Sequence, residues 1–577
     1  MKKSLKKRGQ KFVKKFSRVS KRASVESKEH IKENVFKRVS HILNIKLLIF
    51  EWVLLVVALI MLASAQAIWF GDSYAENAFI SGGTYTEATI GKVNSMNPLF
   101  AANNSERVLS KLLFATLVSD DYSGHPGMEI ASSVIPSENG KTWKMRIKDG
   151  IKWSDGEDLT KEDVLFTLKL IQNPSVNSPY SANLSGVKIS ENEEGEIIFT
   201  LPSVYADFLS VLNIPVLPKH ILGDVQPTNI TEHSFSVEPV TSGPFTLNAT
   251  QSSNDTESTI YLSANQNYFK GAPMLSSFAI KTFETKADVI NAMNAGTVTA
   301  TAELSGLDAN EVTAGQFIKK ESGINWGTYI FFNTAQGAFK NRDLRTAVRK
   351  GIDISRLREA APNTIAINYP IIDSQIVLKN LPAMPERNFD ESASKIAGIA
   401  GENKLSVNIA TVRSGFLPAV GQVLTEELQG LGFEVNLSIY EENQEFVSNV
   451  LSKRSYDILL YDIDLGTDPD PLAYYHSTQI SENGLNLSNY RNVMVDDLLV
   501  GARSTMDKEL RAKKYESFIN YWANDVPAIG LYESNLTYIF NKNVRAFGDN
   551  IRLVTPLDRF TDITNWAVNK GEKNKTP

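Results

Sequence analysis

Hydrophobic and polar residues alternate most regularly between Trp143 and Lys148, where every second residue is apolar and the others are basic. A two-residue period is typical of a half-buried strand. Further on, Thr160 stands three residues before Asp163 at the start of an apolar stripe with helical spacing, which is the pattern of a capping box. The stripe stops at Asn173, because the proline that follows disfavours further helix. The pattern predicts a strand, turns and a capped helix.

A second regular stretch lies between Leu405 and Tyr461. Its apolar positions predict strands at 405–409, 433–439 and 456–461, separated by two helices, of which the first begins at Pro418 and ends at Gly430. Strands that alternate with helices in this way usually form a parallel sheet. The sequence therefore predicts an α/β fold.

The longest apolar run lies between Leu47 and Phe70 and exceeds the roughly 20 residues that a helix needs to cross a bilayer. The 46 residues before it contain 16 Lys or Arg and 3 Glu. This positive excess predicts a single-pass transmembrane helix with a cytoplasmic N-terminus and with everything after Asp72 outside the cell.

Two alternatives remain open for this end of the chain. Ala65-Gln66-Ala67 fits a small-x-small cleavage site, so cleavage of a signal peptide would instead release a secreted protein. The basic leader, residues 1–46, is either a helix on the inner leaflet or a solvated tail. Its charge alone suits nucleic acid, but the sequence contains no nucleic-acid-binding module, and we expect no such partner.

Several segments resemble the peptide-type solute-binding proteins of ABC importers, the class that includes dipeptide, oligopeptide and nickel receptors. The stretch from Glu138 to Asn173 is similar to the signature region of that family. Further similar segments follow the family order, namely NSMNPL at 94–99, PVTSGPF at 239–245, NQNYFKGAP at 265–273, NAMNAG at 291–296, and YIFFNT at 329–334 before FKNRDLRTAVRKGID at 339–353. The resemblance covers about residues 82–563.

The resemblance implies a two-lobe periplasmic-binding-protein-like fold of the large, peptide-binding class. We expect the first lobe to contain residues 84–325 and 527–566, and the second lobe residues 326–526. The remaining parts would be the leader (1–46), the transmembrane helix (47–70), a linker (71–83) and a polar tail (567–577).

Four aspartates follow the third predicted strand of the regular stretch. In open parallel sheets ligands bind beyond the carboxyl ends of strands, and the segment from Tyr461 to Tyr475 begins there. Closely spaced carboxylates repel one another unless they meet a cation or a hydrogen-bond donor. A peptide supplies such a cation in its α-ammonium group. The aspartates are Asp462, Asp464, Asp468 and Asp470.

In peptide-binding members of the family, an aspartate shortly before an Asp-Pro pair holds the amino terminus of the ligand. Asp464 is the nearest match, but its spacing to Asp468-Pro469 is one residue longer than the commonest pattern. Asp462 therefore stays a second candidate, and Asp468 a third. Alternatively, these carboxylates cap the helix that follows or remain solvated.

Two further residues are candidates for ligand contact. Asn333 follows the predicted strand at 329–332, close to the expected crossover between the lobes, where a purely structural turn is the alternative. Arg413 follows another strand end and would suit a ligand carboxylate, with a surface position as the alternative.

The sequence gives no support to catalysis, metal binding or a cofactor. The chain has no cysteine, which excludes disulfides, thiol nucleophiles and a lipid-modified cysteine anchor. Gly140-Lys141-Thr142 lacks the first glycine of a phosphate loop, and the pattern S-x-x-K at 392–395 has none of its companion motifs. Ala473 occupies the position at which a calcium loop needs glutamate.

We therefore expect a membrane-anchored, monomeric extracytoplasmic receptor that captures peptides between two closing lobes and delivers them to an ABC permease, with ATP hydrolysed by separate subunits. The alternatives are the same fold binding nickel, haem or an oligosaccharide, because a fold does not fix its ligand. A surface-anchored hydrolase and a sensory receptor also remain open.

Overall fold

The computed structural model describes residues 46–252, 257–306 and 308–574. The predicted leader lies outside these residues except for Lys46. The chain divides into two units, of which the first contains Met1–Ala78 and Lys570–Pro577 and the second contains Phe79–Asn569.

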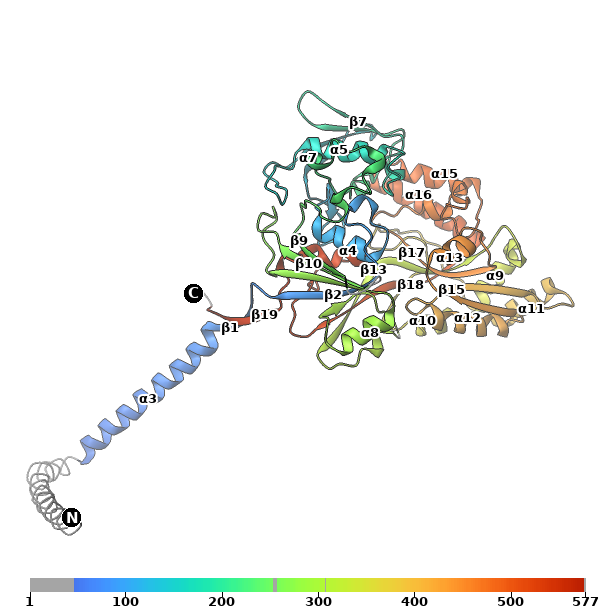
Figure 1. The fold of residues 1–577 in the computed structure, drawn as a ribbon. Helices are drawn as coiled ribbons and strands as arrows, with labels where there is room; N and C mark the ends of the chain where they lie inside the picture. The colour runs from blue at the N-terminus through green and yellow to red at the C-terminus, as the bar shows by residue number, and fades with distance from the viewer. Residues whose placement is uncertain (1–45, 253–256, 307, 575–577) are drawn as a thin grey trace, which may run out of the picture. The chain divides into compact units, whose positions relative to one another are not determined.

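The first unit contains a long helix and contributes to a small sheet. Helix α3 spans Lys46–Tyr74 and is followed by strand β1, Ala75–Ile80. Strand β1 pairs with β19, Asn569–Asn574, in a two-stranded sheet (Figure 1). The predicted linker is thus helix and strand as far as Ile80, and the predicted polar tail contains a strand.

The predicted transmembrane segment at 47–70 falls within α3. Among the residues that the structure describes, no helix combines the length and the apolar character needed to cross a membrane. The structure therefore does not support this part of the prediction.

The second unit is built on one mixed sheet, which has eleven strands within the described residues. Its strands follow the order β16-β15-β17-β13-β18-β12-β2-β11-β10-β9, and β14 also pairs with β18. Helices cover both faces of the part that contains β15 and β17 (Figure 1). The bounds of the strands are β2 Thr84–Ile90, β9 Phe245–Ser252, β10 Ser258–Ala264, β11 Ser277–Phe283, β12 Ala300–Thr301, β13 Phe317–Phe332, β14 Ile365–Ala366, β15 Ser406–Val412, β16 Glu434–Tyr440, β17 Ile458–Asp464 and β18 Ala528–Asn541.

Two smaller sheets and a set of helices complete the second unit. One sheet has the order β5-β6-β8-β7, with bounds Ala131–Pro136, Thr142–Ile147, Ile197–Thr200 and Lys188–Glu191, and the other pairs β3, Val118–Asp120, with β4, Pro126–Met128. The α-helices are α4 Asn104–Leu113, α5 Lys161–Gln172, α6 Phe208–Val211, α7 Lys219–Leu222, α8 Lys286–Asn294, α9 Arg342–Gly351, α10 Ile354–Glu359, α11 Phe389–Ala400, α12 Leu417–Gly430, α13 Gln444–Phe446, α14 Leu472–Tyr475, α15 Val493–Arg503 and α16 Lys508–Asp525.

The local patterns in the sequence match the structure closely. The alternating stretch forms β6, and the capped helix is α5, where the backbone N–H of Thr160 donates to Asp163 Oδ2 at 2.8 Å. Strand β15 pairs in parallel with β16 and with β17, which confirms the predicted parallel arrangement. Strand β17 continues to Asp464 rather than ending at Tyr461, because it pairs with β13 as far as Trp326.

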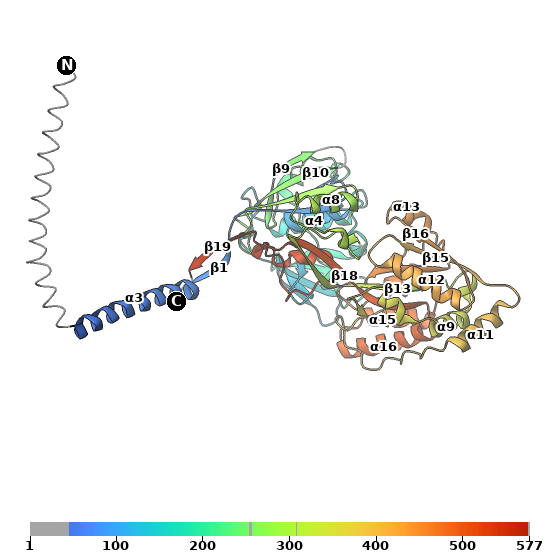
Figure 2. The same cartoon turned by 90° about the horizontal axis from the view of Figure 1, so that it is seen from below.

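The second unit has two large hydrophobic cores. The first core lies around α4, α5 and strands β5, β6 and β9–β11, and the second around β15–β17, α9, α12, α15 and α16. Strands β13 and β18 enter both cores (Figure 2). Ile324 and Tyr538 belong to the first core, whereas Tyr329 and Ile529 belong to the second.

The pairing of β13 with β18 is interrupted where the chain passes from one core to the other. The register shifts between Gly323 and Gly327, as in a bulge that bends a strand locally. Asn325 lies within this bulge and is almost fully buried, with 3% of its surface exposed. Its backbone N–H donates to the carbonyl of Val554, and its own carbonyl accepts from the N–H of Leu465.

The side chain of Asn325 connects the same two regions. Its Nδ2 donates to the carbonyl of Gly466 at 2.8 Å, and its Oδ1 accepts from Arg552 Nη2 at 2.9 Å. The bulge is therefore fixed both to the end of β17 and to the segment around residues 552–554.

We expect the substitution Asn325→Ala to lower the free energy of unfolding by about 1–3 kcal/mol, because it leaves buried partners without hydrogen bonds. Denaturant unfolding of the purified protein measures this change. Asn436→Ala is the matched control, because the Asn436 side chain bonds Asn408 at an exposed position. A loss at Asn325 no larger than that of the control would contradict the assigned role.

Candidate functional site

The four predicted aspartates lie along the end of β17 and the segment that follows it. We call residues 462–470 the aspartate loop. Gln375 Nε2 donates to the carbonyls of Leu465, Gly466 and Asp468. Together with Asn325, this amide fixes the backbone of the loop, so the directions of its carboxylates are set by the fold.

Two of the four carboxylates are held by arginines from the helices of the second core. Both carboxylate oxygens of Asp468 accept from the guanidinium group of Arg511, with Nη1 to Oδ1 at 2.6 Å. Asp470 Oδ2 accepts from Arg503 Nε at 2.5 Å. Asp470 Oδ1 also accepts from the backbone N–H of Leu472 at the start of α14. These contacts favour the structural alternative for Asp468 and Asp470 over contact with a ligand.

Asp462 is the first residue of the aspartate loop and still belongs to strand β17. It lies opposite Thr328 of β13, and its Oδ1 accepts from the Thr328 hydroxyl group. Burial raises the pKa of Asp462 to about 6. The long pairing of β17 with β13 therefore removes this carboxylate from the position that the sequence suggested.

Asp464 ends β17 and has an exposed side chain. Its Oδ1 accepts from the backbone N–H of Gly466 at 2.8 Å. Burial by surrounding protein raises the pKa of Asp464, the negative charge of Asp558 raises it further, and Arg107 opposes this effect. The Asp464 side chain is thus accessible to solvent, while the surrounding protein partly desolvates its carboxylate.

The groups around Asp464 come from the first core. Arg107 lies on α4 with an exposed side chain, and Asp558 accepts backbone N–H groups at Val554 and Thr555. Asp120, at the end of β3, also lies near Asp464 and Asp558. Burial and then the charge of Asp558 raise the pKa of Asp120 to about 7, and Asp464 adds to the effect.

A cavity of about 310 Å³ lies beside Asp120. Its polar lining includes Lys111, Glu129 and Lys270, and its aromatic lining Phe114, Tyr122, Tyr268 and Phe560. Glu129 pairs with Lys270 at 2.5 Å. Within the described chain, the side chains of Lys111 and Asp120 form no ion pair of this kind. The cavity therefore presents one ammonium and one carboxyl group that are available to a polar guest.

Asn333 has a different place from the one expected. It is fully buried, its Nδ2 donates to the carbonyls of Arg454 and Tyr456, and its Oδ1 accepts from Ala335 and Asn489. Both ends of its amide are thus bonded within the protein. This placement favours the structural alternative.

Arg413 follows β15, as expected, and is exposed. Its Nε donates to Glu441 at 2.8 Å, while its carbonyl accepts at 3.3 Å from Nζ of Lys286, the first residue of α8. The backbone of Gly306 also lies against the backbone of Gly415, which follows β15. The space is too small for a side chain, because a Cβ atom at Gly306 would lie 2.8 Å from the carbonyl oxygen of Gly415. The end of β15 therefore touches the region of α8, and the guanidinium group already has a carboxylate partner.

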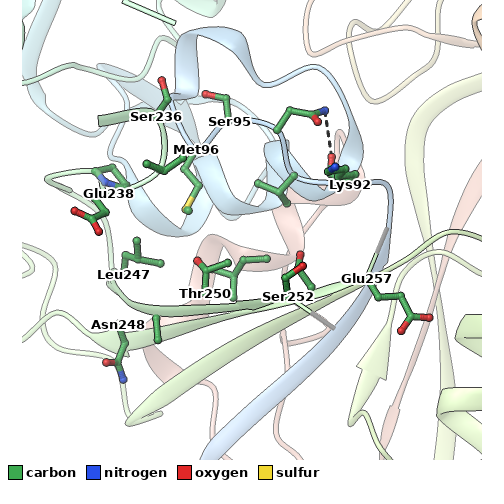
Figure 3. Close-up of a pocket in the computed structure, with 17 residues that line it drawn as sticks. Lys92, Ser95, Met96, Ser236, Glu238, Leu247, Asn248, Thr250, Ser252 and Glu257 are labelled. Atoms are coloured by element: carbon green, nitrogen blue, oxygen red, sulfur yellow. Dashed lines mark hydrogen bonds between the residues drawn. The ribbon is translucent and has the colours of Figure 1, made fainter. Parts of the chain in front are cut away.

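A second, larger hollow of about 620 Å³ lies beside β9 and β10. Figure 3 shows Met96 and Ser95 on one side of it and Leu247 and Thr250 of β9 on the other. None of the residues proposed from the sequence lines it. Its position at the edge of the large sheet makes it a weaker candidate than the cavity beside Asp120.

Metal binding finds no support in the part of the chain that the structure describes. No group of three or more histidine, aspartate or glutamate side chains is placed there to hold an ion.

The sequence analysis did not identify Asp120, Lys111, Asn325 or Gln375. Asp120 stands in the common context of an acidic turn, and Lys111 on an amphipathic helix. No local pattern distinguishes these residues, since only the folded chain brings them close to Asp464.

Comparison with known proteins identifies the family. A model of the bacterial extracellular solute-binding proteins, family 5, matches residues 125–486, more than half of the chain. The chain belongs to this family. Its members are binding proteins for transporters rather than enzymes, so the expectation of a non-enzymatic, extracytoplasmic binding protein agrees with the family.

Individual relatives agree with the family assignment. The oligopeptide-binding protein AppA of Bacillus subtilis is 24% identical over 501 residues, which cover 81% of this chain and 89% of AppA. The solved structure of AppA in complex with a nonapeptide has a TM-score of 0.70 and covers 85% of this chain and 100% of that one at 22% identity. NikZ from Campylobacter jejuni, solved in complex with Ni(L-His), has a TM-score of 0.71 and covers 84% of this chain and 99% of that one at 20% identity. These structures confirm the two-lobe fold.

The ion pair of Asp468 with Arg511 provides a test of the structural role of the aspartate loop. Both side chains are about nine-tenths buried, with 11% and 10% exposed. We expect Asp468→Ala to lower the free energy of unfolding by about 3 kcal/mol, because it leaves an unpaired buried arginine. Thermal or urea unfolding measures the loss.

The control for this test is Glu441→Gln, which removes the partner of Arg413 in an exposed pair, with 62% and 68% of the two side chains accessible. An exposed pair contributes about 0–1 kcal/mol. Equal losses in the two variants would contradict the structural role of Asp468.

Proposed function

We propose that this protein captures short peptides with a free amino terminus and delivers them to an ABC permease. The observation that carries the proposal is the state of Asp464. Asp468 and Asp470 have arginine partners and Asp462 is bonded within the sheet, whereas Asp464 is exposed beside further carboxylates.

The charges around Asp464 favour a cationic guest. Asp120, Asp464 and Asp558 lie close enough to raise the pKa of Asp120 together with burial. A positive charge placed among them would relieve their repulsion. An α-ammonium group also donates three hydrogen bonds, and charge-assisted hydrogen bonds of this kind are stronger than neutral ones.

The cavity beside Asp120 suits the first side chain of such a peptide. Its volume of about 310 Å³ is at the low end of small-ligand sites. The lining combines aromatic rings with Lys111 and Asp120, so it offers contacts to apolar and polar side chains alike. A lining of this kind supports a receptor with broad peptide specificity.

The relatives support a peptide as the solute. AppA is named an oligopeptide-binding protein and was solved with a nonapeptide. NikZ was solved with Ni(L-His), but the described residues of this chain hold no cluster of potential metal ligands. We therefore favour a peptide over a metal chelate.

We further propose that the chain is anchored in the cytoplasmic membrane by residues 47–70, with the second unit outside the cell. The sequence supports this through its apolar run and its basic leader. The large apolar side chains of α3 between Phe50 and Leu62 are exposed, with 44–66% of the surface of each accessible. Lipid would cover such side chains.

We expect Asp464→Asn to weaken binding of short peptides about 100-fold, because a carboxylate paired with a partly buried ammonium group contributes about 2–5 kcal/mol. Calorimetry or native mass spectrometry with peptides of mixed sequence measures the loss. Asp497→Asn, at an exposed position on α15, should leave binding unchanged.

Acetylation of the peptide amino terminus provides the matching change in the ligand. Acetylated peptides should bind weakly to the native protein and equally weakly to Asp464→Asn. Undiminished binding of acetylated peptides would disprove the role of the ammonium group. A sugar or metal chelate retained by the purified protein would disprove the peptide assignment.

Cell fractionation tests the proposed anchor. We expect the full chain to remain with membranes after an alkaline wash, whereas a chain without residues 1–70 should be released. In intact cells with a permeable wall, added protease should digest the second unit. Release of the full chain by alkaline washing would contradict the anchor.

A further inference from the structure

A short segment of the first core meets the aspartate loop and the helices of the second core. The backbone N–H of Ala206 donates to the carbonyl of Arg503 at 2.8 Å. The hydroxyl groups of Ser210 and Thr467 lie 3.0 Å apart. The guanidinium group of Arg503 stacks over the ring of Tyr205 at 5.2 Å. We call residues 204–211 the bridging segment.

The bridging segment belongs to the first core through Phe208, which is 1% exposed. Arg503 ends α15, whose residues Leu499 and Ala502 belong to the second core. The contacts of the segment therefore connect the two cores. Solute-binding proteins that close around a ligand form such contacts on closure and lose them on opening.

Asp207 lies in the middle of the bridging segment, between the residues that make these contacts. In the part of the chain that the structure describes, its Oδ2 is buried and has no hydrogen-bond partner. A buried carboxylate oxygen without a partner is costly when the group is ionised. A protonated carboxyl group carries no net charge and avoids most of this cost.

The charged groups that face Asp207 come from three elements. Asp468 and Asp470 lie in the aspartate loop, Arg511 on α16 and Arg503 at the end of α15. The two arginines already pair with the two aspartates. Ionised Asp207 would thus add a third negative charge to a cluster in which the positive charges have partners.

Neutral groups add little to the charge balance. Tyr205 and Tyr515 lie close to the cluster, and the hydroxyl group of Ser210 pairs with that of Thr467 at 3.0 Å. Burial is the largest cause that raises the pKa of Asp207, to about 8; the negative charges of Asp468 and, less strongly, Asp470 also raise it, while Arg511 opposes them.

We propose that Asp207 takes up a proton when the two cores close on each other, so that closure, and with it ligand binding, is coupled to proton uptake. The proposal rests on closure around a solute and does not depend on the solute being a peptide.

The sign of the pH dependence follows from linkage. In the open state Asp207 faces solvent and should have a pKa of about 4, the usual value for an aspartate. In the structure, where the bridging segment contacts the second core, burial raises its pKa to about 8, and we take this arrangement as the closed state. A group with a higher pKa in the closed state stabilises that state at low pH. The closing equilibrium therefore decreases by up to about tenfold per pH unit between those values and levels off above them.

Fluorescence energy transfer between two labels can measure closure directly. The chain has no cysteine, so two introduced cysteines can carry the labels without competition. Lys188→Cys on β7 and Glu445→Cys on α13 place the two labels at exposed sites, one in the part of the chain that contains the first core and one in the part that contains the second. The experiment uses the full chain, without added ligand, over a pH range from about 5 to 9.

We expect the labelled native protein to lose energy transfer as the pH rises. Asp207→Asn mimics the protonated carboxyl group, so this variant should stay closed at all pH values. Asp224→Asn, an exposed aspartate on the same side, should behave as the native protein does. Asp468→Asn removes the negative charge that contributes most to raising the pKa of Asp207 and should move the opening midpoint by about one pH unit or more to lower pH.

Energy transfer that is independent of pH in the native protein would overturn the proposal, as would a pH response of Asp207→Asn equal to the native one. Because no ligand is added, failure here leaves the peptide assignment untouched. If Asp464→Asn loses peptide binding but closes with the same pH dependence as the native protein, the peptide-binding role of Asp464 is separate from the proton uptake by Asp207.

Discussion

The structure depends on one pair of strands that serves both hydrophobic cores. Strands β13 and β18 pair over most of their length, yet their register shifts between Gly323 and Gly327, where the chain leaves one core for the other. A continuous ladder would make the two halves rigid, whereas a bulge bends a strand locally. Asn325 fixes this bend to the end of β17 and to residues 552–554, so the position of Asp464 is set by the same interaction that connects the cores.

The distribution of positive charge gives each aspartate of the loop its role. Arg503 and Arg511 come from helices that pack in the second core, and they neutralise Asp470 and Asp468. Their guanidinium groups hold the loop in place at the cost of two potential ligand contacts. The first core supplies Asp120, Asp558 and Arg107 near Asp464. Of the four aspartates in the loop, Asp464 is thereby left exposed and without an arginine partner. A partly desolvated carboxylate of this kind can pair with a cationic group of a solute.

Local patterns predicted much of the fold, whereas the site required long-range contacts. The alternation before Lys148, the capping box at Thr160 and the parallel strands β15–β17 are properties of short segments, and the structure contains all of them. Asp462 was placed in a loop because periodicity cannot show that β17 pairs with β13 beyond Tyr461. Asn333 was expected near the crossover, but the passage between the cores lies at the bulge, eight residues earlier at Asn325. The arginine partners of Asp468 and Asp470 stand 43 and 33 residues away, beyond the reach of any motif.

The close approach of Gly306 to Gly415 has a consequence for how the halves separate. Backbone meets backbone there, with the ring of Phe416 beside it, and the contact itself is too close for any side chain at Gly306. The opposite boundary, at Tyr205 and Arg503, must instead unstack a ring from a guanidinium group. Separation of the halves would therefore break a close backbone contact at one boundary and a contact between a ring and a guanidinium group at the other.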